Sequence, residues 1–399
     1  MTSNQTQYDV IIIGGGASGL MCAAVLNNEQ PSLKVLVIDS NEKPGRKLLA
    51  TGNGRCNFTN LNLSSEFYNT DDPVKLTSIL TRFPSQAVID YFEDKLGVIA
   101  SYKGDLVYPI TYQSKTVSDA LVNACKNTEF VYGTKVTSVV KSGMNYEVNG
   151  MYSAFAVVFA CGGVSLPDSG SDGSLYPIIM SYAGSDSFAP LLPSLVALKS
   201  SDKDIKKLSG LRQECTLNMD GHIEKGELLF TDYGISGICV MQLSGFYNRS
   251  LASGRKIPFV SVDLIPSMSN SEKLTKVKEL MNRFPDRNPA DAISGLLKKP
   301  LAQCVCARTN GTAEDIARII SDFKINLSGS QGFTNAQITS GGLKLNKVTD
   351  DLELINAHGI YVIGEALNVD GLCGGYNLHW AWASAMTAAR SIADELEVL

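Results

Sequence analysis

The sequence predicts an α/β fold in which a parallel sheet is interrupted by a second domain. Three observations predict it. An apolar strand, a glycine-rich turn and a helix follow one another near the N-terminus, in the order typical of a parallel βαβ unit. Between about Leu191 and Asn335 the chain becomes polar and alternating, which favours short antiparallel strands. Apolar, glycine-rich segments then return. We therefore expect residues 1–190 and 336–399 to form one domain and residues 191–335 an inserted domain.

The composition indicates a packed globular protein. Of 399 residues, 44% are hydrophobic and 19% charged, which argues against disorder and coiled coil. A formal net charge of −5 supplies no global attraction to nucleic acid or anionic lipid, although it does not exclude a local basic patch. The nine cysteines contain no C-x-x-C pair and the three histidines lie far apart. We expect free thiols, no metal site and a reducing, cytoplasmic compartment.

The apolar stretch from Val10 to Leu26 has the length of a membrane anchor, but its details argue against one. No Lys or Arg precedes it, Asp9 stands at its entrance, and three successive glycines begin at Gly14. Glycines in series weaken a helix, and a signal peptide starts with positive charge. We expect neither a signal peptide nor a membrane span.

The first chemical signal is the glycine turn between a predicted strand, Tyr8–Ile13, and a predicted helix, Ala17–Asn27. Its G-x-G-x-x-G spacing permits a tight turn, lets a pyrophosphate approach the backbone, and lets the helix press against the sheet. The helix N-terminus attracts phosphate. The predicted diphosphate site comprises Gly14, Gly15, Gly16, Ala17, Ser18 and Gly19.

A second predicted strand, Val35–Ile38, ends at Asp39, twenty residues after Gly19. An acid at this position accepts hydrogen bonds from the adenosine ribose of a dinucleotide. The alternative is a glycine-rich turn in some other α/β protein. The strand, helix and acid together favour dinucleotide binding.

Four further motifs follow this turn in the sequence. They are P-G-R-K at 44–47, G-N-G-R-C-N-x-T-N at 52–60, F-A-C-G-G at 159–163, and G-E at 364–365 followed by D-G-x-x-G-G-Y-N at 370–377. With them the chain resembles the HI0933-like flavoproteins, a branch of the two-dinucleotide-binding-domain superfamily. The resemblance implies a Rossmann-like (glutathione reductase-type) FAD-binding domain with an inserted β-barrel plus helical domain, and FAD as the cofactor.

The same resemblance implies where FAD is held. Val136, in an expected strand from Gly133 to Val140, would meet adenine, and Glu365 would bind the ribityl chain. A helix from about Asn377 to Glu395 would point its N-terminus at the flavin N1 and C2 carbonyl, where reduced flavin is negative. Besides the glycine turn and Asp39, the implied cofactor-binding residues are Arg46, Lys47, Gly54, Arg55, Cys56, Asn57, Val136, Ala160, Gly162, Gly163, Gly364, Glu365, Gly374, Gly375, Tyr376 and Asn377.

Within the insert, Arg212–Met219 and Glu227–Phe230 alternate as strands do. Leu274 to Phe284, and then Ile316 to Phe323, carry apolar residues at helical spacing. Thr312 with Asp315 resembles a capping box. We expect a small-molecule substrate to bind between the insert and the flavin, because pockets favour domain interfaces.

The reaction is a hypothesis that rests on the resemblance. The family's activities include reduction of activated C=C bonds, in steroid enones and in a uridine of ribosomal RNA, and oxidation of a small amino ketone. No second G-x-G-x-x-G is present, so NADH or NADPH would dock transiently as reductant. We favour an NAD(P)H-driven enone reductase. The alternatives are a ribosomal RNA uridine reductase, an O₂-dependent amino ketone oxidase, and a non-catalytic RNA- or ribosome-binding flavoprotein.

The catalytic residues are not identified by the sequence. Arg55 is a candidate for stabilising an anionic substrate or the reduced flavin. His379, in the first turn of the last predicted helix, is a candidate proton donor; alternatively, it is a helix residue satisfied by a neighbour. For Cys56, a small buried hydrophobe is the alternative to a nucleophile.

Overall fold

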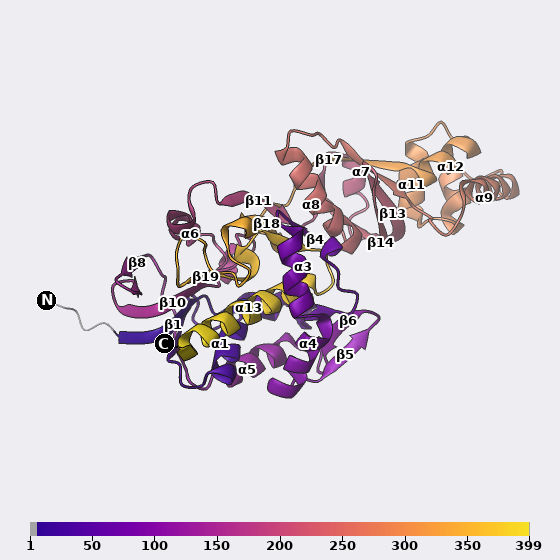
Figure 1. The fold of residues 1–399 in the computed structure, drawn as a ribbon. Helices are drawn as coiled ribbons and strands as arrows, with labels where there is room; N and C mark the ends of the chain where they lie inside the picture. Colours follow the sequence, from indigo (N-terminus) through magenta and orange to yellow (C-terminus); the bar gives the residue numbers. More distant parts are fainter. Residues whose placement is uncertain (1–5, 399) are drawn as a thin grey trace. The chain divides into compact units, whose positions relative to one another are not determined.

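The computed structural model describes residues 6–398, which form two compact units (Figure 1). The first unit takes in the described chain up to Leu191 and again from Ile338, and the second runs from Leu192 to Gln337. In the described part of the chain, no helix has the length and apolar character needed to cross a membrane.

The first unit is built on a seven-stranded sheet. Its strands, in spatial order, are β7 (Thr128–Val131), β2 (Val35–Ile38), β1 (Thr6–Ile13), β10 (Tyr152–Phe159), β9 (Asn145–Val148) and β8 (Val139–Ser142), with β19 (Ile360–Val362) also on β10. β7, β2, β1, β10 and β19 are parallel. β9 pairs with the first half of β10 and β19 with the second half. The predicted α/β parallel-sheet fold is confirmed.

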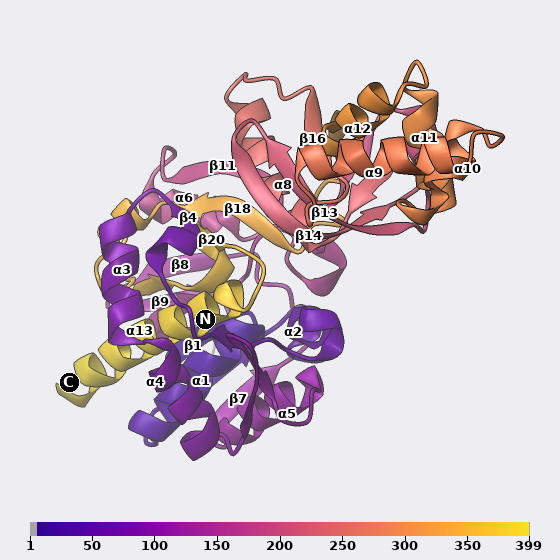
Figure 2. The ribbon, with the colours of Figure 1, turned by 90° about the vertical axis from the view of Figure 1, so that its right-hand side faces the viewer.

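Helices cover this sheet, and two of them lie side by side although they come from opposite ends of the chain. Figure 1 and Figure 2 show α13 (Tyr376–Val398) alongside α1 (Ala17–Glu29), with which it is in contact. Small buried residues in both, such as Ala23 and Ala385, allow close packing. The other helices of this unit are α2 (Arg46–Ala50), α3 (Pro73–Arg82), α4 (Ser85–Asp90), α5 (Ser114–Ala124) and α6 (Tyr176–Ala183).

Besides the two-stranded sheet of β11 (Phe188–Ser194) and β18 (Ile338–Leu343), two small sheets lie wholly within the first unit. β3 (Thr59–Asn60), β6 (Leu106–Pro109) and β5 (Ala100–Lys103) form one, and β4 (Tyr68–Thr70) with β20 (Val369–Gly371) forms the other. The second pair joins an early segment to a late one. β11 and β18 are the strands in which the chain leaves and re-enters this unit.

The second unit contains a closed barrel. Its strands, in order around the barrel, are β12 (Leu198–Ser200), β15 (Gly234–Ser236), β14 (His222–Phe230), β13 (Arg212–Met219), β16 (Phe259–Asp263) and β17 (Phe323–Ser330). Inward side chains such as Leu217, Phe230 and Val262 are fully buried, as alternation in a closed sheet requires. The predicted barrel is confirmed.

Helices accompany the barrel: α7 (Lys203–Lys206), α8 (Ile238–Ala252), α9 (Asn270–Arg283), α10 (Pro289–Ala292), α11 (Lys299–Ala307) and α12 (Ala313–Ser321). Only one half of the predicted capping box of α12 is present. The Thr312 side chain accepts from the backbone N–H of Asp315, whereas the Asp315 carboxylate accepts from the N–H of Asn310. Phe323 was expected on this helix but lies in β17. The helix ends at Ser321, and Phe323 fills the barrel core instead.

Candidate functional site

The parallel strands of the first unit end along one edge, and backbone hydrogen bonds fix this alignment. The N–H of Gly14 donates to Ile38 O at 2.8 Å, that of Ala160 to Ile13 O at 2.9 Å, and that of Ile363 to Phe159 O at 3.0 Å. Residues directly after β1, β2, β10 and β19 therefore meet at this edge. Ligands of open α/β sheets bind at the carboxyl ends of such strands.

The glycine turn after β1 has room for a ligand at one position and none at two others. A Cβ on Gly14 would collide with Ala160 O, and one on Gly19 with Gly14 O. Beside Gly16, a Cβ would meet no atom within 4 Å. The turn is therefore packed against protein on one side and open at Gly16.

α1 begins at this open position without a side-chain cap. The N–H groups of its first turn, from Ala17 to Gly19, have no acceptor from a capping side chain. Such a terminus is suited to an anion, because free N–H groups and the helix dipole point at it.

Asp39 directly follows β2 and lies against the glycine turn. Its Oδ2 accepts from the N–H of Gly15 at 2.6 Å and its Oδ1 from the N–H of Asn41 at 2.7 Å. The side chain is 7% exposed. Its carboxylate is therefore held in one orientation.

The segment from residue 133 to 138 lies beside Asp39 but is not the strand expected from Gly133 to Val140. Thr134 N–H donates to Asp39 O at 3.0 Å, and Val136 is buried. Asn149 replaces a partner strand, since its Oδ1 accepts from Thr137 N–H at 2.8 Å and its Nδ2 donates to Lys135 O at 3.0 Å. The strand β8 starts only at Val139.

Lys47, Glu365 and Thr339 meet at the same edge. Lys47 Nζ lies 2.7 Å from Glu365 Oε2, and Thr339 N–H donates to Glu365 Oε1 at 2.8 Å. A Cβ on Gly163 would lie 2.7 Å from Glu365 Oε1, so glycine is required there. Arg46 is exposed and donates to Asn41 Oδ1 at 3.3 Å. Thr339 was not singled out in the sequence, because no local motif marks it.

The loop that follows α2 is shaped by positive φ angles at Gly54 (80°) and Cys56 (57°). A Cβ on Gly54 would meet no atom within 4 Å, and Arg55 is exposed. Cys56 is fully buried, and burial raises the pKa of its thiol to about 12. The thiol is therefore protonated and unsuited to nucleophilic attack.

Asn57 faces the chain's second glycine-rich segment. A Cβ on Gly375 would lie 3.0 Å from Asn57 Oδ1. This oxygen is buried and accepts no hydrogen bond from the part of the chain that the structure describes. Buried acceptors rarely stay unpaired, so a donor on a bound ligand would satisfy it.

The late segment from Gly364 to Asn377 is fastened to the early one. Asn60 Nδ2 donates to Gly374 O at 2.8 Å, and Tyr376 Oη donates to Asn62 O at 3.2 Å. Asn377 closes its own loop by accepting from Gly371 N–H at 2.8 Å. A Cβ on Gly364 would lie 2.6 Å from Ser18 Oγ, so this turn reaches α1 directly.

His379 is buried and paired on both ring nitrogens. Nε2 lies 3.0 Å from Phe83 O, which can only accept, so Nε2 carries the proton and Nδ1 accepts from Thr59 Oγ1 at 2.8 Å. Burial lowers its pKa to about 4, although the Phe83 carbonyl acts in the opposite direction. At neutral pH it is an uncharged residue that fastens α13, which is the alternative raised for it above.

These features together fit FAD. The space beside Gly16 and the uncapped start of α1 suit a diphosphate, Asp39 suits a ribose hydroxyl, and the unpaired Asn57 oxygen suits a ring N–H. All come from the first unit. Sequence reasoning selected these residues by motif, whereas the partners Thr339 and Asn149 appear only once the chain is folded.

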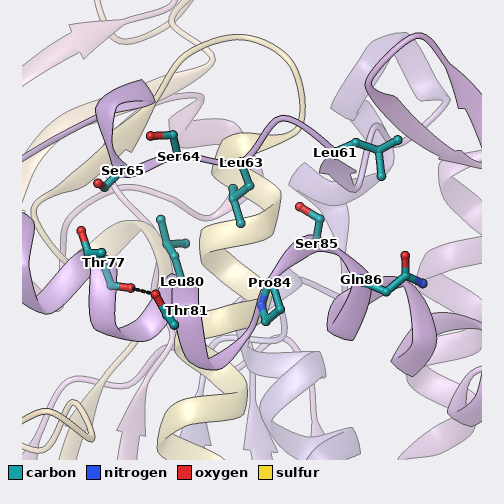
Figure 3. Close-up of a pocket in the computed structure, with 10 residues that line it drawn as sticks. All are labelled: Leu61, Leu63, Ser64, Ser65, Thr77, Leu80, Thr81, Pro84, Ser85 and Gln86. Carbon is teal, nitrogen blue, oxygen red and sulfur yellow. Dashed lines mark hydrogen bonds between the residues drawn. The ribbon is translucent and has the colours of Figure 1, made fainter.

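Two other features of the first unit lie outside this group of residues. A surface cavity of about 570 Å³ is lined by leucines, a proline, hydroxyl side chains and one amide. Its lining residues, drawn in Figure 3, are Leu61, Leu63, Ser64, Ser65, Thr77, Leu80, Thr81, Pro84, Ser85 and Gln86. Separately, His358 is held between Glu353 at 2.8 Å and Glu395 at 3.1 Å. Each imidazole nitrogen therefore has a carboxylate oxygen within hydrogen-bond distance.

Comparison with known proteins places the chain among flavoproteins. The Rossmann-domain model of the HI0933-like proteins matches residues 8–391. A 3-dehydro-bile acid delta(4,6)-reductase from Clostridium scindens is 31% identical over 96% of this chain and 98% of its own length. A ribosomal RNA dihydrouridine synthase from Escherichia coli is 30% identical over 97% and 98%.

Solved structures agree on the fold. A 3-ketosteroid delta1-dehydrogenase from Sterolibacterium denitrificans superposes with a TM-score of 0.53 at 14% identity, over 98% of this chain and 100% of its own. A quinol fumarate reductase from E. coli gives 0.51 at 12% identity, over 98% and 71%. At such low identity the likeness establishes the architecture alone.

Proposed function

Since the chain belongs to the HI0933-like family of FAD-dependent oxidoreductases, we propose that it is a reductase that takes hydride from NADH or NADPH and delivers it to an electron-poor C=C bond. The observation that carries the proposal is the near-complete alignment with a relative named as a bile acid delta(4,6)-reductase. The family model, which spans residues 8–391, includes both glycine-rich segments of the first unit. Bound FAD supplies the chemistry, by accepting and donating hydride.

The proposed cofactor contacts run along the strand edge. The N–H groups at Gly16, Ala17 and Ser18 would bind the diphosphate, and Asp39 would bind the adenosine ribose. The backbone beside Val136, which is buried, would contact adenine. These assignments rest on the open space at Gly16, the uncapped helix and the hydrogen bonds that fix Asp39.

The flavin end is proposed to lie against Asn57, Gly375 and the N-terminus of α13. A helix N-terminus stabilises nearby negative charge by about 0.3–2 kcal/mol. The reduced flavin is more negative than the oxidised one, so this end of α13 would favour reduction. Glu365 would bind the ribityl hydroxyls, as its position beside Gly163 allows.

Arg55 is proposed to bind the substrate. It is exposed on the loop that contains Asn57, and its guanidinium makes no ion pair with the residues that the structure describes. A guanidinium there would polarise a carbonyl conjugated to the C=C bond and so favour hydride addition. Exchange for methionine should lower kcat/KM for the enone by a larger factor than it lowers FAD affinity.

The test is anaerobic stopped-flow spectroscopy of the FAD-loaded protein. NADH or NADPH should bleach the flavin absorption, and a steroid with a conjugated 3-ketone should restore it. Failure of both nicotinamides, together with failure of every enone to reoxidise chemically reduced protein, would overturn the proposal. Rapid reoxidation by O₂ with peroxide release would favour the amino ketone oxidase instead.

A second candidate is reduction of a uridine in ribosomal RNA. The relative from E. coli with that name also aligns over nearly the whole chain. It predicts that a ribosomal RNA transcript reoxidises the reduced protein and that dihydrouridine appears in the product. The net charge of −5 gives no global attraction to RNA, which is why the small-molecule substrate is favoured.

A further inference from the structure

Lys47 and Glu365 form an ion pair that links the two separated parts of the first unit. Nζ and Oε2 are 2.7 Å apart, and each side chain is 21% exposed. Lys47 lies in α2 and Glu365 in the turn after β19, 318 residues later. Such a pair is screened less than the exposed pairs elsewhere in the chain.

Glu365 is held on both of its oxygens. Oε1 accepts from Thr339 N–H at 2.8 Å, while Thr339 Oγ1 accepts from the N–H groups of Val164 at 2.8 Å and Ser165 at 3.1 Å. Thr339 is 1% exposed. The carboxylate is therefore fixed by one neutral contact and one cation.

The negative charge of Glu365 affects the pKa values of neighbouring side chains. Burial is the main cause of the raised pKa values of Tyr176 and Cys161, and the Glu365 charge adds to both. Without Lys47, a partly buried carboxylate would stand uncompensated where an anionic cofactor must bind. An unpaired charge in such a place is costly.

We propose that Lys47 is a positioning residue for FAD that acts through Glu365. It compensates the carboxylate so that the anionic dinucleotide can bind beside it, and it holds that carboxylate toward the ribityl chain. The inference rests on the proposed cofactor role of Glu365. The alternative is that Lys47 contacts FAD directly, and measurements on variants can distinguish the indirect role from the direct one.

The experiment is FAD titration of the apoprotein, followed by flavin fluorescence at constant ionic strength. Lys47→Met should weaken binding at least about ten-fold, and Lys47→Arg should stay within about three-fold of the wild type because it keeps the ion pair. Glu365→Gln should also bind FAD, since its amide oxygen still accepts hydrogen bonds. The double variant Lys47→Met/Glu365→Gln should recover the affinity of Glu365→Gln, because no uncompensated charge remains.

A second readout is the midpoint potential of the bound flavin. It should become more negative in Lys47→Met, where the free carboxylate opposes the negative reduced state, and return in the double variant. Lys115→Met is the matched control, because Lys115 pairs with Asp119 at 72% exposure and should change neither quantity.

Additive losses in the double variant would overturn the proposal, because Lys47 would then contact FAD directly. Unchanged affinity in Lys47→Met would overturn it as well. If Lys47→Met does not fold, as judged by circular dichroism, the arginine and double variants still decide the question. A wild-type protein that binds no FAD would instead refute the proposed function, which is a distinguishable result.

Discussion

Gly16 and Gly19 are three residues apart in one turn, yet glycine is needed at each position for a different reason. Gly19 is fixed by folding, because a side chain there would strike the carbonyl of Gly14. Gly16 has open space and an ordinary φ of −81°. Only ligand binding gives a reason for glycine at position 16.

Alanine substitutions at the two positions should therefore affect different properties, namely stability at Gly19 and FAD binding at Gly16. Gly19→Ala should lower the free energy of unfolding of the apoprotein by about 1–3 kcal/mol through overpacking. Gly16→Ala should leave it within about 0.5 kcal/mol and weaken FAD binding about ten-fold or more. Urea denaturation and FAD titration measure the two. Full FAD affinity in Gly16→Ala would show that the diphosphate does not bind at this turn.

His379 makes stability depend on pH. Its pKa is about 4 in the folded protein and 6.5 without burial, so between these values the unfolded chain binds more protons. Stability is then complete above pH 6.5 and falls as the pH drops toward 4, by about 3 kcal/mol at most. His379→Gln should flatten this part of the profile of urea midpoints, whereas His222→Gln, at an exposed position, should retain it. A wild-type profile that is flat in this window would contradict the burial of His379.

At the scale of elements, α13 is anchored by two indoles. Trp380 Nε1 donates to Gly364 O at 3.0 Å and Trp382 Nε1 to Phe58 O at 2.9 Å. Both side chains are buried. The helix is thereby attached to each of the two segments that carry the proposed flavin contacts.

Trp382→Phe should destabilise the protein by about 1–3 kcal/mol, because the buried Phe58 carbonyl loses its donor. Urea denaturation monitored by circular dichroism measures this loss. The remaining indole, Trp380, reports on α13 by fluorescence. An unchanged urea midpoint would show that this hydrogen bond does not hold the helix.

Local patterns predicted most elements of the sheet edge. Runs of β-branched residues predicted β1 and β2, and the end of β2 at Ile38 follows from the change to the polar residues 39–41. The segment from Gly133 to Ser138 could not be predicted in this way. Its backbone groups bond to Asp39, Asn41 and the Asn149 side chain, and such distant partners leave no periodic pattern.

At the scale of the whole molecule, some residues of the site could be predicted from local motifs and others could not. The glycine and acid motifs could be predicted from the sequence because each has a local conformational requirement, as at Gly14 with its φ of 111°. Thr339 and the Lys47–Glu365 pair depend on the sheet order, which brings the ends of β10 and β19 together. A single sequence does not encode that order in any one segment.

The central claim is that two segments far apart in sequence jointly bind one FAD. Hydrogen–deuterium exchange of the apoprotein with and without FAD tests it most directly, with Gly16→Ala as the variant of impaired binding. FAD should slow exchange in peptides covering residues 14–19 and 46–57 and, at the same FAD concentration, in those covering residues 364–377. Protection confined to the early peptides, or absent from both segments, would contradict the claim.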